Sequence, residues 1–201
     1  FRTNKIIRYV LNWTNAGDGT IYCWNDYYNI VMFNMRTTDM HNAFRNNYII
    51  TKAACGPRVT NMAQTYNNCR NLTGQPACGN KVTNMNGTYY DCPNLTGSPV
   101  CGPNVTDMYD TYGYCYNLTG SPVCGPNVTS MHWTYYHCYS LTGNPVCGDN
   151  VTSLYGTYKN CYNITGSPVC GNNVTRMVDT YYGFSNLYGN MYVFSDNVSN
   201  V

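Results

Sequence analysis

The chain has 201 residues, a formal net charge of +2 and only 10% charged residues, against about 25% in a typical soluble domain. So little charge indicates neither a nucleic-acid-binding protein nor a protein that binds anionic membranes. No stretch reaches the roughly 18 apolar residues of a membrane span, and 22 tyrosines supply much of the apolar surface of one elongated domain.

The N-terminal segment 1–39 does not follow the periodic pattern of the rest of the chain. It holds several large aromatic residues, among them Trp13 and Trp24. The first unit of a repeat stack has no neighbour on one side, so its core needs a lid. We therefore expect 1–39 to be an N-terminal cap.

A step of 23 residues organises the chain from 40 to 187. It joins Cys115 to Cys138 and Tyr112 to Tyr135, and the same step recurs on either side. A fixed period of this size indicates a solenoid, in which each repeat is one rung and neighbouring rungs complete one another's core. We expect about seven rungs of 22–23 residues over 40–187. Segment 188–201 is then a C-terminal cap or the start of a further segment.

The second half of each rung has helical spacing. Met131, Tyr135, Cys138 and Leu141 are separated by steps of four, three and three residues, which places them on one face of a short α- or 3₁₀-helix. The run Pro122–Cys124 of the preceding half is bounded by glycines and predicts a very short strand between turns. The expected fold class is a repeat solenoid of short parallel β-strands alternating with short helical or 3₁₀ segments.

Several residues recur at fixed offsets in every rung. One rung reads Asn127-Val128-Thr129-x-Met131-x-x-Thr134-Tyr135-x-x-Cys138-x-x-Leu141-Thr142. This run resembles the repeat of BspA-like leucine-rich-repeat proteins, which typically reads N-V-T-x-M-x-x-M-F-x-x-C-x-x-L-T. The resemblance extends from about Thr38 to the end of the chain. It implies a leucine-rich-repeat-like solenoid, and the rung departs from the family where Thr-Gly-Ser-Pro-Val-Cys follows Leu118.

The twelve cysteines form two columns and one outlier. The first column is Cys69, Cys92, Cys115, Cys138 and Cys161; the second is Cys55, Cys78, Cys101, Cys124, Cys147 and Cys170; Cys23 stands apart. Free thiols that pack as small hydrophobes are one reading, and in the resembled family the first-column position is buried and often unpaired. Disulfides between cysteines nine residues apart, with 23 paired to 55, are the other. Zinc is disfavoured because Cys-x₂₋₄-Cys spacing is absent.

No catalytic constellation is visible, so we expect no enzyme activity, no cofactor and no metal site. His41, His132 and His137 are scattered, and the aspartates, such as Asp107 and Asp110, stand at turn positions where Asp commonly caps the chain. Asn-x-Ser/Thr triplets are abundant, for example at Asn117. They are glycosylation sites only if the source modifies them, and otherwise are part of the repeat.

The variable positions predict a binding surface. Tyr116, Tyr139 and Tyr162 each follow a first-column cysteine on the apolar face, so they turn outward, and Trp133 lies on the same side. Stacked tyrosines at one-rung spacing form a flat surface of the kind that proteins and sugars bind. The alternatives are that the tyrosines merely pack on one another, or that the small-residue row around Ser121 is the binding face.

We therefore expect a non-enzymatic recognition or adhesion solenoid located outside the cell, at a cell surface or at a virion surface. Its partner is a host or cell-surface protein or glycan, with no nucleic acid and no membrane insertion. The alternative is a structural fibre or decoration protein that assembles into a homo-oligomer or filament through its terminal rungs. A third reading, weaker than both, is a flat ice- or surface-binding face formed by a row of threonines such as Thr142.

Overall fold

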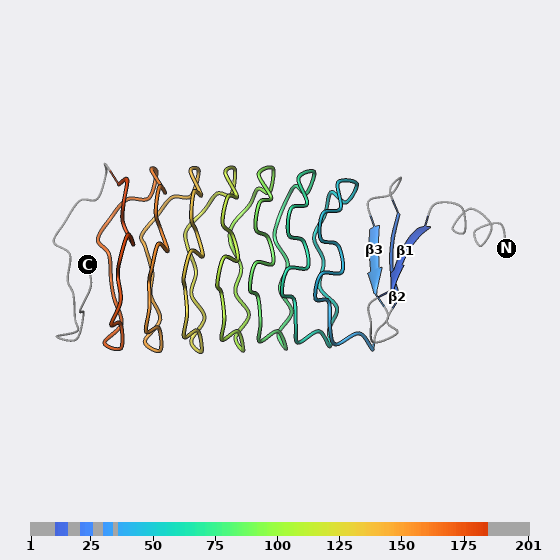
Figure 1. Cartoon of the computed structure of the whole chain (residues 1–201), viewed down its shortest axis with the longest axis horizontal. Coiled ribbons are helices and arrows are strands. Elements are labelled where there is room, and N and C mark those ends of the chain that lie inside the picture. The colour runs from blue at the N-terminus through green and yellow to red at the C-terminus, as the bar shows by residue number, and fades with distance from the viewer. Residues whose placement is uncertain (1–10, 16–20, 26–29, 34–35, 185–201) are drawn as a thin grey trace.

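The computed structural model describes residues 11–15, 21–25, 30–33 and 36–184, with side chains from residue 36 onward. Strands β1 (Leu11–Asn15), β2 (Ile21–Asn25) and β3 (Ile30–Phe33) form an antiparallel sheet in the order β1-β2-β3. This sheet lies at the N-terminal end of the molecule (Figure 1). It falls within the expected cap 1–39, whose aromatic side chains lie outside the described residues, as does the whole of segment 188–201.

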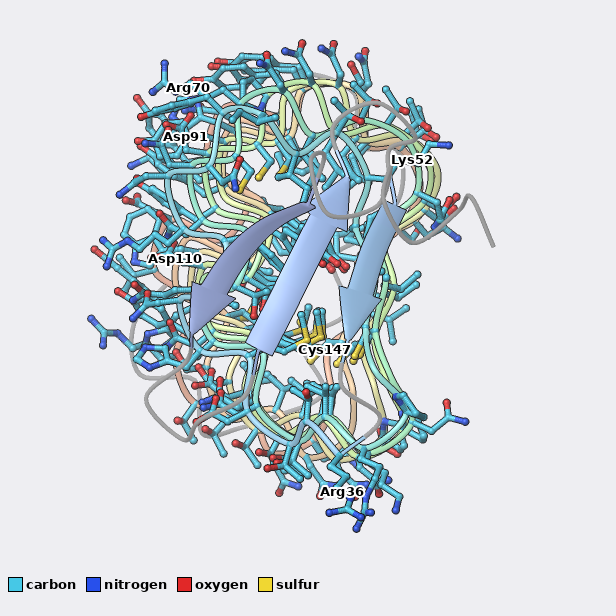
Figure 2. All side chains as sticks on the ribbon, turned by 90° about the vertical axis from the view of Figure 1, so that its right-hand side faces the viewer. Arg36, Lys52, Arg70, Asp91, Asp110 and Cys147 are labelled. Atoms are coloured by element: carbon cyan, nitrogen blue, oxygen red, sulfur yellow. The ribbon has the colours of Figure 1, made fainter. Side chains whose placement is uncertain are left out.

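The repeats lie side by side as successive parallel turns of chain (Figure 1). Six isolated parallel bridges connect seven of them, from Asp39↔Asn61 to Ser153↔Arg176. The first bridge spans 22 residues and the others span 23. Viewed along the stack, equivalent side chains of different rungs lie behind one another (Figure 2). Each position of the repeat therefore becomes a column that runs along the molecule.

The expected helix of each rung is absent from the described residues, and consecutive turns take its place. The N–H groups of Trp133 and Tyr135 donate to the carbonyl oxygens of Tyr155 and Thr157 in the next rung, at 3.0 and 2.9 Å. The N–H of Tyr136, between these positions, donates back to the carbonyl of Trp133 at 3.1 Å. Alternate N–H groups thus join neighbouring rungs instead of closing helical turns.

Two residues of this segment have left-handed backbone angles in every described rung. In one rung they are Trp133, with φ of 56°, and His137, with φ of 60°. An α-helix needs right-handed angles throughout, so helical side-chain spacing in the sequence produces a buried face here without producing a helix.

The core is one continuous cluster made of the same positions in each rung. In one rung, Val105, Met108, Tyr112, Cys115 and Leu118 all have 0% of their surface exposed. These are the positions that the periodic pattern places on the apolar face. A single rung buries too little to offset the entropy of ordering its residues, so stability comes from contact with its neighbours.

The core tyrosines explain why the short strand expected at the Pro-Val-Cys segment does not form in the rungs between residues 36 and 168. The hydroxyl of Tyr112 donates to the carbonyl of Val100 at 2.7 Å and accepts from the N–H of the same residue at 2.9 Å. The N–H and C=O groups of the middle residue in the Pro-Val-Cys segment therefore form hydrogen bonds with a core tyrosine and not with the backbone of the next rung.

Polar side chains add further bonds between rungs. The buried hydroxyl of Thr134 donates to the carbonyl of Met108 at 2.8 Å. The amide of Asn117, in an Asn-x-Thr triplet, donates to the carbonyl of Pro93 at 2.9 Å. Asparagine amides at the equivalent position, and those of the Asn-Val-Thr triplets, make the same kind of bond along the stack. These asparagines therefore have a structural role in the repeat.

Candidate functional site

Three of the four residues predicted to bind form one stacked row. The ring centroids of Tyr116 and Tyr139 are 5.0 Å apart with an interplanar angle of 9°, and those of Tyr139 and Tyr162 are 5.4 Å apart with an angle of 18°. Tyr116 and Tyr139 are half-buried, and Tyr162 is 44% exposed. The row is therefore both packed and accessible.

The cysteine before each of these tyrosines sets their direction. Cys115 is fully buried, and its thiol donates to the carbonyl of Tyr89 in the preceding rung at 3.1 Å. Because the side chain of Cys115 points into the core, that of Tyr116 is directed outward. The same relationship holds for Cys138 and Tyr139.

Trp133, the fourth predicted residue, lies beside this row and is linked to it through other rings. It makes edge contacts with Tyr136 and Tyr155, with centroids 4.7 and 4.9 Å apart. Tyr136 contacts His137 at 4.1 Å, and His137 contacts Tyr139 at 5.4 Å. The structure thus places all four predicted residues in one aromatic surface, which we call the aromatic face.

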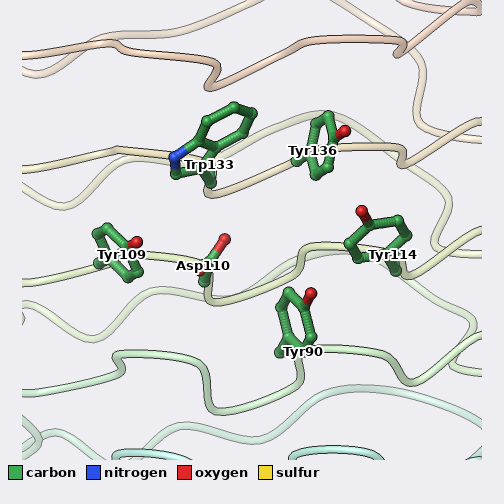
Figure 3. Close-up of a pocket in the computed structure, with 6 residues that line it drawn as sticks. All are labelled: Tyr90, Tyr109, Asp110, Tyr114, Trp133 and Tyr136. Atoms are coloured by element: carbon green, nitrogen blue, oxygen red, sulfur yellow. The ribbon is translucent and has the colours of Figure 1, made fainter.

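A hollow of about 200 Å³ lies within the aromatic face. Figure 3 shows its lining: Tyr109 and Asp110, Tyr90 and Tyr114, and Trp133 and Tyr136. The ring of Tyr114 contacts those of Tyr90 and Tyr136 edge-on, at 5.4 and 5.0 Å. Residues of three successive rungs therefore form this hollow, which we call the Asp110 pocket.

Asp110 is the one carboxylate of the pocket. It is half-buried, and its side chain makes no hydrogen bond or ion pair within 36–184. Burial raises the pKa of Asp110 to about 6. Tyr109 and Tyr114, which line the same pocket, also have raised pKa values, mainly because they are partly buried. Both hydroxyls therefore stay neutral near pH 7. The pocket therefore holds one weakly solvated negative charge among aromatic rings.

A second hollow of about 240 Å³ adjoins the first and shares Tyr90 and Tyr114 with it. Here the carboxylate is paired: Arg70 Nη2 lies 2.6 Å from Asp91 Oδ2. Figure 2 places Arg70, Asp91 and Asp110 on the same side of the stack. The aromatic face thus contains one carboxylate with its own cation and another without one.

The histidines of the aromatic face have roles in packing. His137 Nδ1 lies 2.6 Å from the hydroxyl of Tyr139, and its ring stacks on Tyr114 with centroids 5.0 Å apart. Burial and then the nearby Lys159 lower the pKa of His137. His132 bonds to Ser153, and its pKa is also lowered, first by burial. Both are therefore neutral near pH 7 and orient neighbouring rings.

The eleven cysteines with described side chains all have free thiols. Burial raises the pKa of Cys69, in the first column, to about 12. In the second column, burial and then the neighbouring Cys78 raise the pKa of Cys55 to about 11. A Cβ atom at Gly125 would lie 2.8 Å from Cys101 Sγ, so a larger residue at this position would clash with the thiol. The thiols act as packing groups, and Figure 2 shows Cys147 in the interior.

Within 36–184, no group of three or more His, Cys or Asp side chains is arranged to hold a metal ion. Across the described part of the chain, no helix is long and apolar enough to cross a membrane.

Comparison with models of protein families, with curated proteins and with solved structures finds no match for this chain.

Of the six residues that line the Asp110 pocket, only Trp133 is among the four predicted binding residues. From the sequence alone, Asp110 is assigned to a turn and Tyr114 is not singled out. A signal for Tyr114 exists, because the same repeat position holds Asn68 and Asn160 in other rungs, residues that adopt left-handed angles readily. Tyr114 has φ of 63°, which is unfavourable for a bulky side chain.

Proposed function

We propose that the chain is a non-enzymatic recognition module, built as a leucine-rich-repeat-like solenoid, that binds a protein partner through its aromatic face. Support for the solenoid comes from the 23-residue bridges and the continuous core. In this proposal the module acts outside the cell, at a cell surface or at a virion surface.

The observation that carries the proposal is backbone strain beneath the aromatic face. Tyr114 and Trp133 have φ of 63° and 56°, at positions where asparagine, aspartate or glycine stands in most other rungs. A bulky residue in this region costs on the order of 1–2 kcal/mol. Residues held in such angles cluster at ligand-binding sites. Glycine or asparagine would relieve the strain, and in this proposal the two rings are kept because they contribute to binding.

The chemistry of the face suits a protein interface. Tyrosine and tryptophan are enriched among the residues that contribute most to protein binding. Each presents a rigid ring with few rotatable bonds, so little side-chain entropy is lost on binding. Prior stacking of Tyr116 on Tyr139 at 5.0 Å reduces that loss further.

The test compares the wild-type chain with the variant Tyr116→Ser/Tyr139→Ser/Tyr162→Ser. Both are applied to a panel of purified cell-surface ectodomains and, in parallel, to a glycan array. We expect wild-type binding to an ectodomain and a loss of about tenfold or more in the variant, the effect of one lost hot spot of about 1.4 kcal/mol. Binding to glycans alone would contradict the choice of a protein partner.

Two control variants separate binding from packing. Tyr116→Phe/Tyr139→Phe/Tyr162→Phe keeps the stacked rings and removes the Tyr139 hydroxyl bonded to His137, so its stability should fall by no more than the about 0.5–1.5 kcal/mol of a hydrogen bond. Ser121→Ala/Asn144→Ala changes the small-residue row and should retain binding. If the serine variant loses several degrees of stability, these tyrosines are packing residues, and if the small-residue variant loses binding, that row is the interface.

A further inference from the structure

Two rungs carry an aspartate at the position of Asp110, and the second shows what this position does. Asp179 stands two residues after Met177, as Asp110 does after Met108. Lys159 Nζ lies 2.8 Å from Asp179 Oδ2 and 4.7 Å from the centroid of the Tyr182 ring. Near the C-terminal end, the repeat therefore holds a lysine ammonium between a carboxylate and a tyrosine.

At the Asp110 pocket the same positions lack the ammonium. The residue equivalent to Lys159, one rung before the aspartate, is Tyr90, and the residue equivalent to Tyr182 is Gly113. A Cβ atom at Gly113 would lie 3.1 Å from the ring of Tyr90, so glycine leaves room for that ring. The carboxylate is thus present, the internal cation is replaced by a ring, and a hollow of about 200 Å³ remains.

Aromatic rings surround this carboxylate in the way that favours a cation. Figure 3 shows Asp110 between Tyr109 on one side and Tyr90 and Tyr114 on the other, with Trp133 and Tyr136 on the next rung. The faces of tryptophan and tyrosine attract ammonium and guanidinium groups. The chain uses this attraction for its own cations, because Arg176 also lies over a tyrosine ring, at 4.5 Å from the Tyr155 centroid.

We propose that the Asp110 pocket binds the alkylammonium group of a lysine side chain presented by the protein partner. This inference rests on the proposed function, since it names the chemical group that the aromatic face takes from its partner. The size of the hollow agrees with it: drug-sized ligands occupy about 300–1,000 Å³, whereas this hollow of about 200 Å³ suits one functional group. The bound ammonium would sit as Lys159 sits at Asp179.

The electrostatics support the same ligand. A half-buried carboxylate loses part of its hydration, which is why the pKa of Asp110 is raised to about 6. The carboxylate is still ionised near pH 7.5 and lacks a cationic partner within 36–184. An incoming ammonium replaces the lost hydration with a charge-assisted hydrogen bond.

Three capped tripeptides test the ligand chemistry directly. Acetyl-Gly-Lys-Gly-amide carries the free ammonium, the Nε-acetylated form is neutral, and the Nε-trimethylated form keeps the charge without N–H donors. The measurement is the shift of the Trp133 indole N–H resonance, identified by its loss in Trp133→Phe. We expect saturable shifts with the two cationic peptides and affinity weaker by about tenfold or more for the acetylated one.

Two variants test the site. Asp110→Asn retains the shape of the side chain and removes its charge, so the affinity for the lysine peptide should fall by about tenfold or more, whereas Asp149→Asn, which removes an exposed aspartate outside the pocket, should leave it unchanged. Tyr90→Lys reproduces the arrangement of Lys159 and should fill the pocket from within, which abolishes peptide binding while the chain stays folded.

Equal affinity for the lysine and acetyl-lysine peptides, unchanged binding in Asp110→Asn, or no shift with any peptide would each overturn the inference. The proposed function fails separately. If an ectodomain binds the aromatic face and is indifferent to Asp110→Asn, the recognition module stands and the lysine pocket is wrong. If the cationic peptides bind but no ectodomain does, the pocket stands and the protein-recognition role is wrong.

Discussion

The hydroxyl of Tyr135 is bonded to both backbone groups of Val123. It donates to the carbonyl oxygen at 2.7 Å and accepts from the N–H at 2.9 Å. The tyrosine ring itself is fully buried and stacks between the equivalent rings of the neighbouring rungs, 5.6 Å from Tyr112 and 5.5 Å from Tyr158. One side chain thus fills the core and completes the hydrogen bonding of the opposite wall.

Replacing Tyr135 by phenylalanine should reveal the energetic weight of this arrangement. Tyr135→Phe keeps the ring stack and removes both hydrogen bonds to the half-buried backbone of Val123, at about 0.5–1.5 kcal/mol for each bond. A loss of this size lowers the thermal midpoint of a 150–250-residue domain by roughly 2–4 °C per kcal/mol. Circular dichroism melting measures it. Tyr155→Phe, whose hydroxyl has no hydrogen bond within 36–184, is the matched control, and equal midpoints for both variants would contradict the prediction.

Asp110 should destabilise the folded chain near neutral pH. Its folded pKa of about 6 is above its ordinary value, so its contribution to stability is fully present below about pH 4 and is lost as the pH rises through about 6. Asp110→Asn removes this loss, and asparagine tolerates the φ of 51° found there. We expect the variant to melt at a higher temperature than wild type near pH 7.5 and at a similar temperature near pH 4.

The control for this prediction is Asp149→Asn, whose aspartate is exposed. A pH-independent difference between wild type and Asp110→Asn would show that the carboxylate is not desolvated. If Asp110→Asn gains stability and loses binding to the lysine peptide, Asp110 behaves as a binding residue that the fold does not need.

The thiols should be unreactive until the chain unfolds. The thiolate is the reactive form, and a pKa two units above the ordinary value lowers its fraction about 100-fold at neutral pH. With pKa values of about 11 for Cys55 and about 12 for Cys69, native alkylation by iodoacetamide should be slow. Mass spectrometry after denaturation without reductant should show the eleven described cysteines alkylated. A denatured chain that takes no label would instead show that the cysteines are joined in disulfides, as the pairing of cysteines nine residues apart requires.

The asparagine amides should stabilise the contact between rungs. Asn117→Asp replaces the N–H donor that bonds the Pro93 carbonyl with an oxygen that repels it, so it should cost more than the about 0.5–1.5 kcal/mol of one hydrogen bond. Asn144→Asp makes the same chemical change at a residue that is also exposed but whose side-chain amide makes no hydrogen bond within 36–184, so it should be nearly neutral. Urea unfolding of the two variants gives the comparison, and equal midpoints would mean that the amide bond contributes nothing.

The buried face of the repeat was predictable because it depends on spacing alone. Met131, Tyr135 and Cys138 are buried whichever backbone connects them, since the core needs apolar side chains every three or four residues. The helix predicted from that spacing was wrong. Backbone angles at Trp133 and His137, and hydrogen bonds to the next rung, are set by stacking, which is tertiary information that local spacing does not contain.

The aromatic face was partly predictable for the same reason. The outward direction of Tyr116 follows from the inward direction of Cys115, one residue earlier. The Asp110 pocket was not predictable, because it joins residues of three rungs whose mutual positions depend on the register of stacking. The comparison of Asp110 with Asp179 becomes informative only when Lys159 is seen to reach from one rung to the next.

The described rungs meet their neighbours through the same backbone atoms. The N–H of Thr129 donates to the carbonyl of Thr106 at 3.0 Å, and the N–H of Thr152 donates to that of Thr129 at 3.0 Å. A duplicated 23-residue unit would therefore find ready-made surfaces on both sides, whereas a partial unit would displace each column by a fraction of a turn. Adding or removing whole 23-residue units would therefore change the distance of the aromatic face from either end of the stack without changing its chemistry.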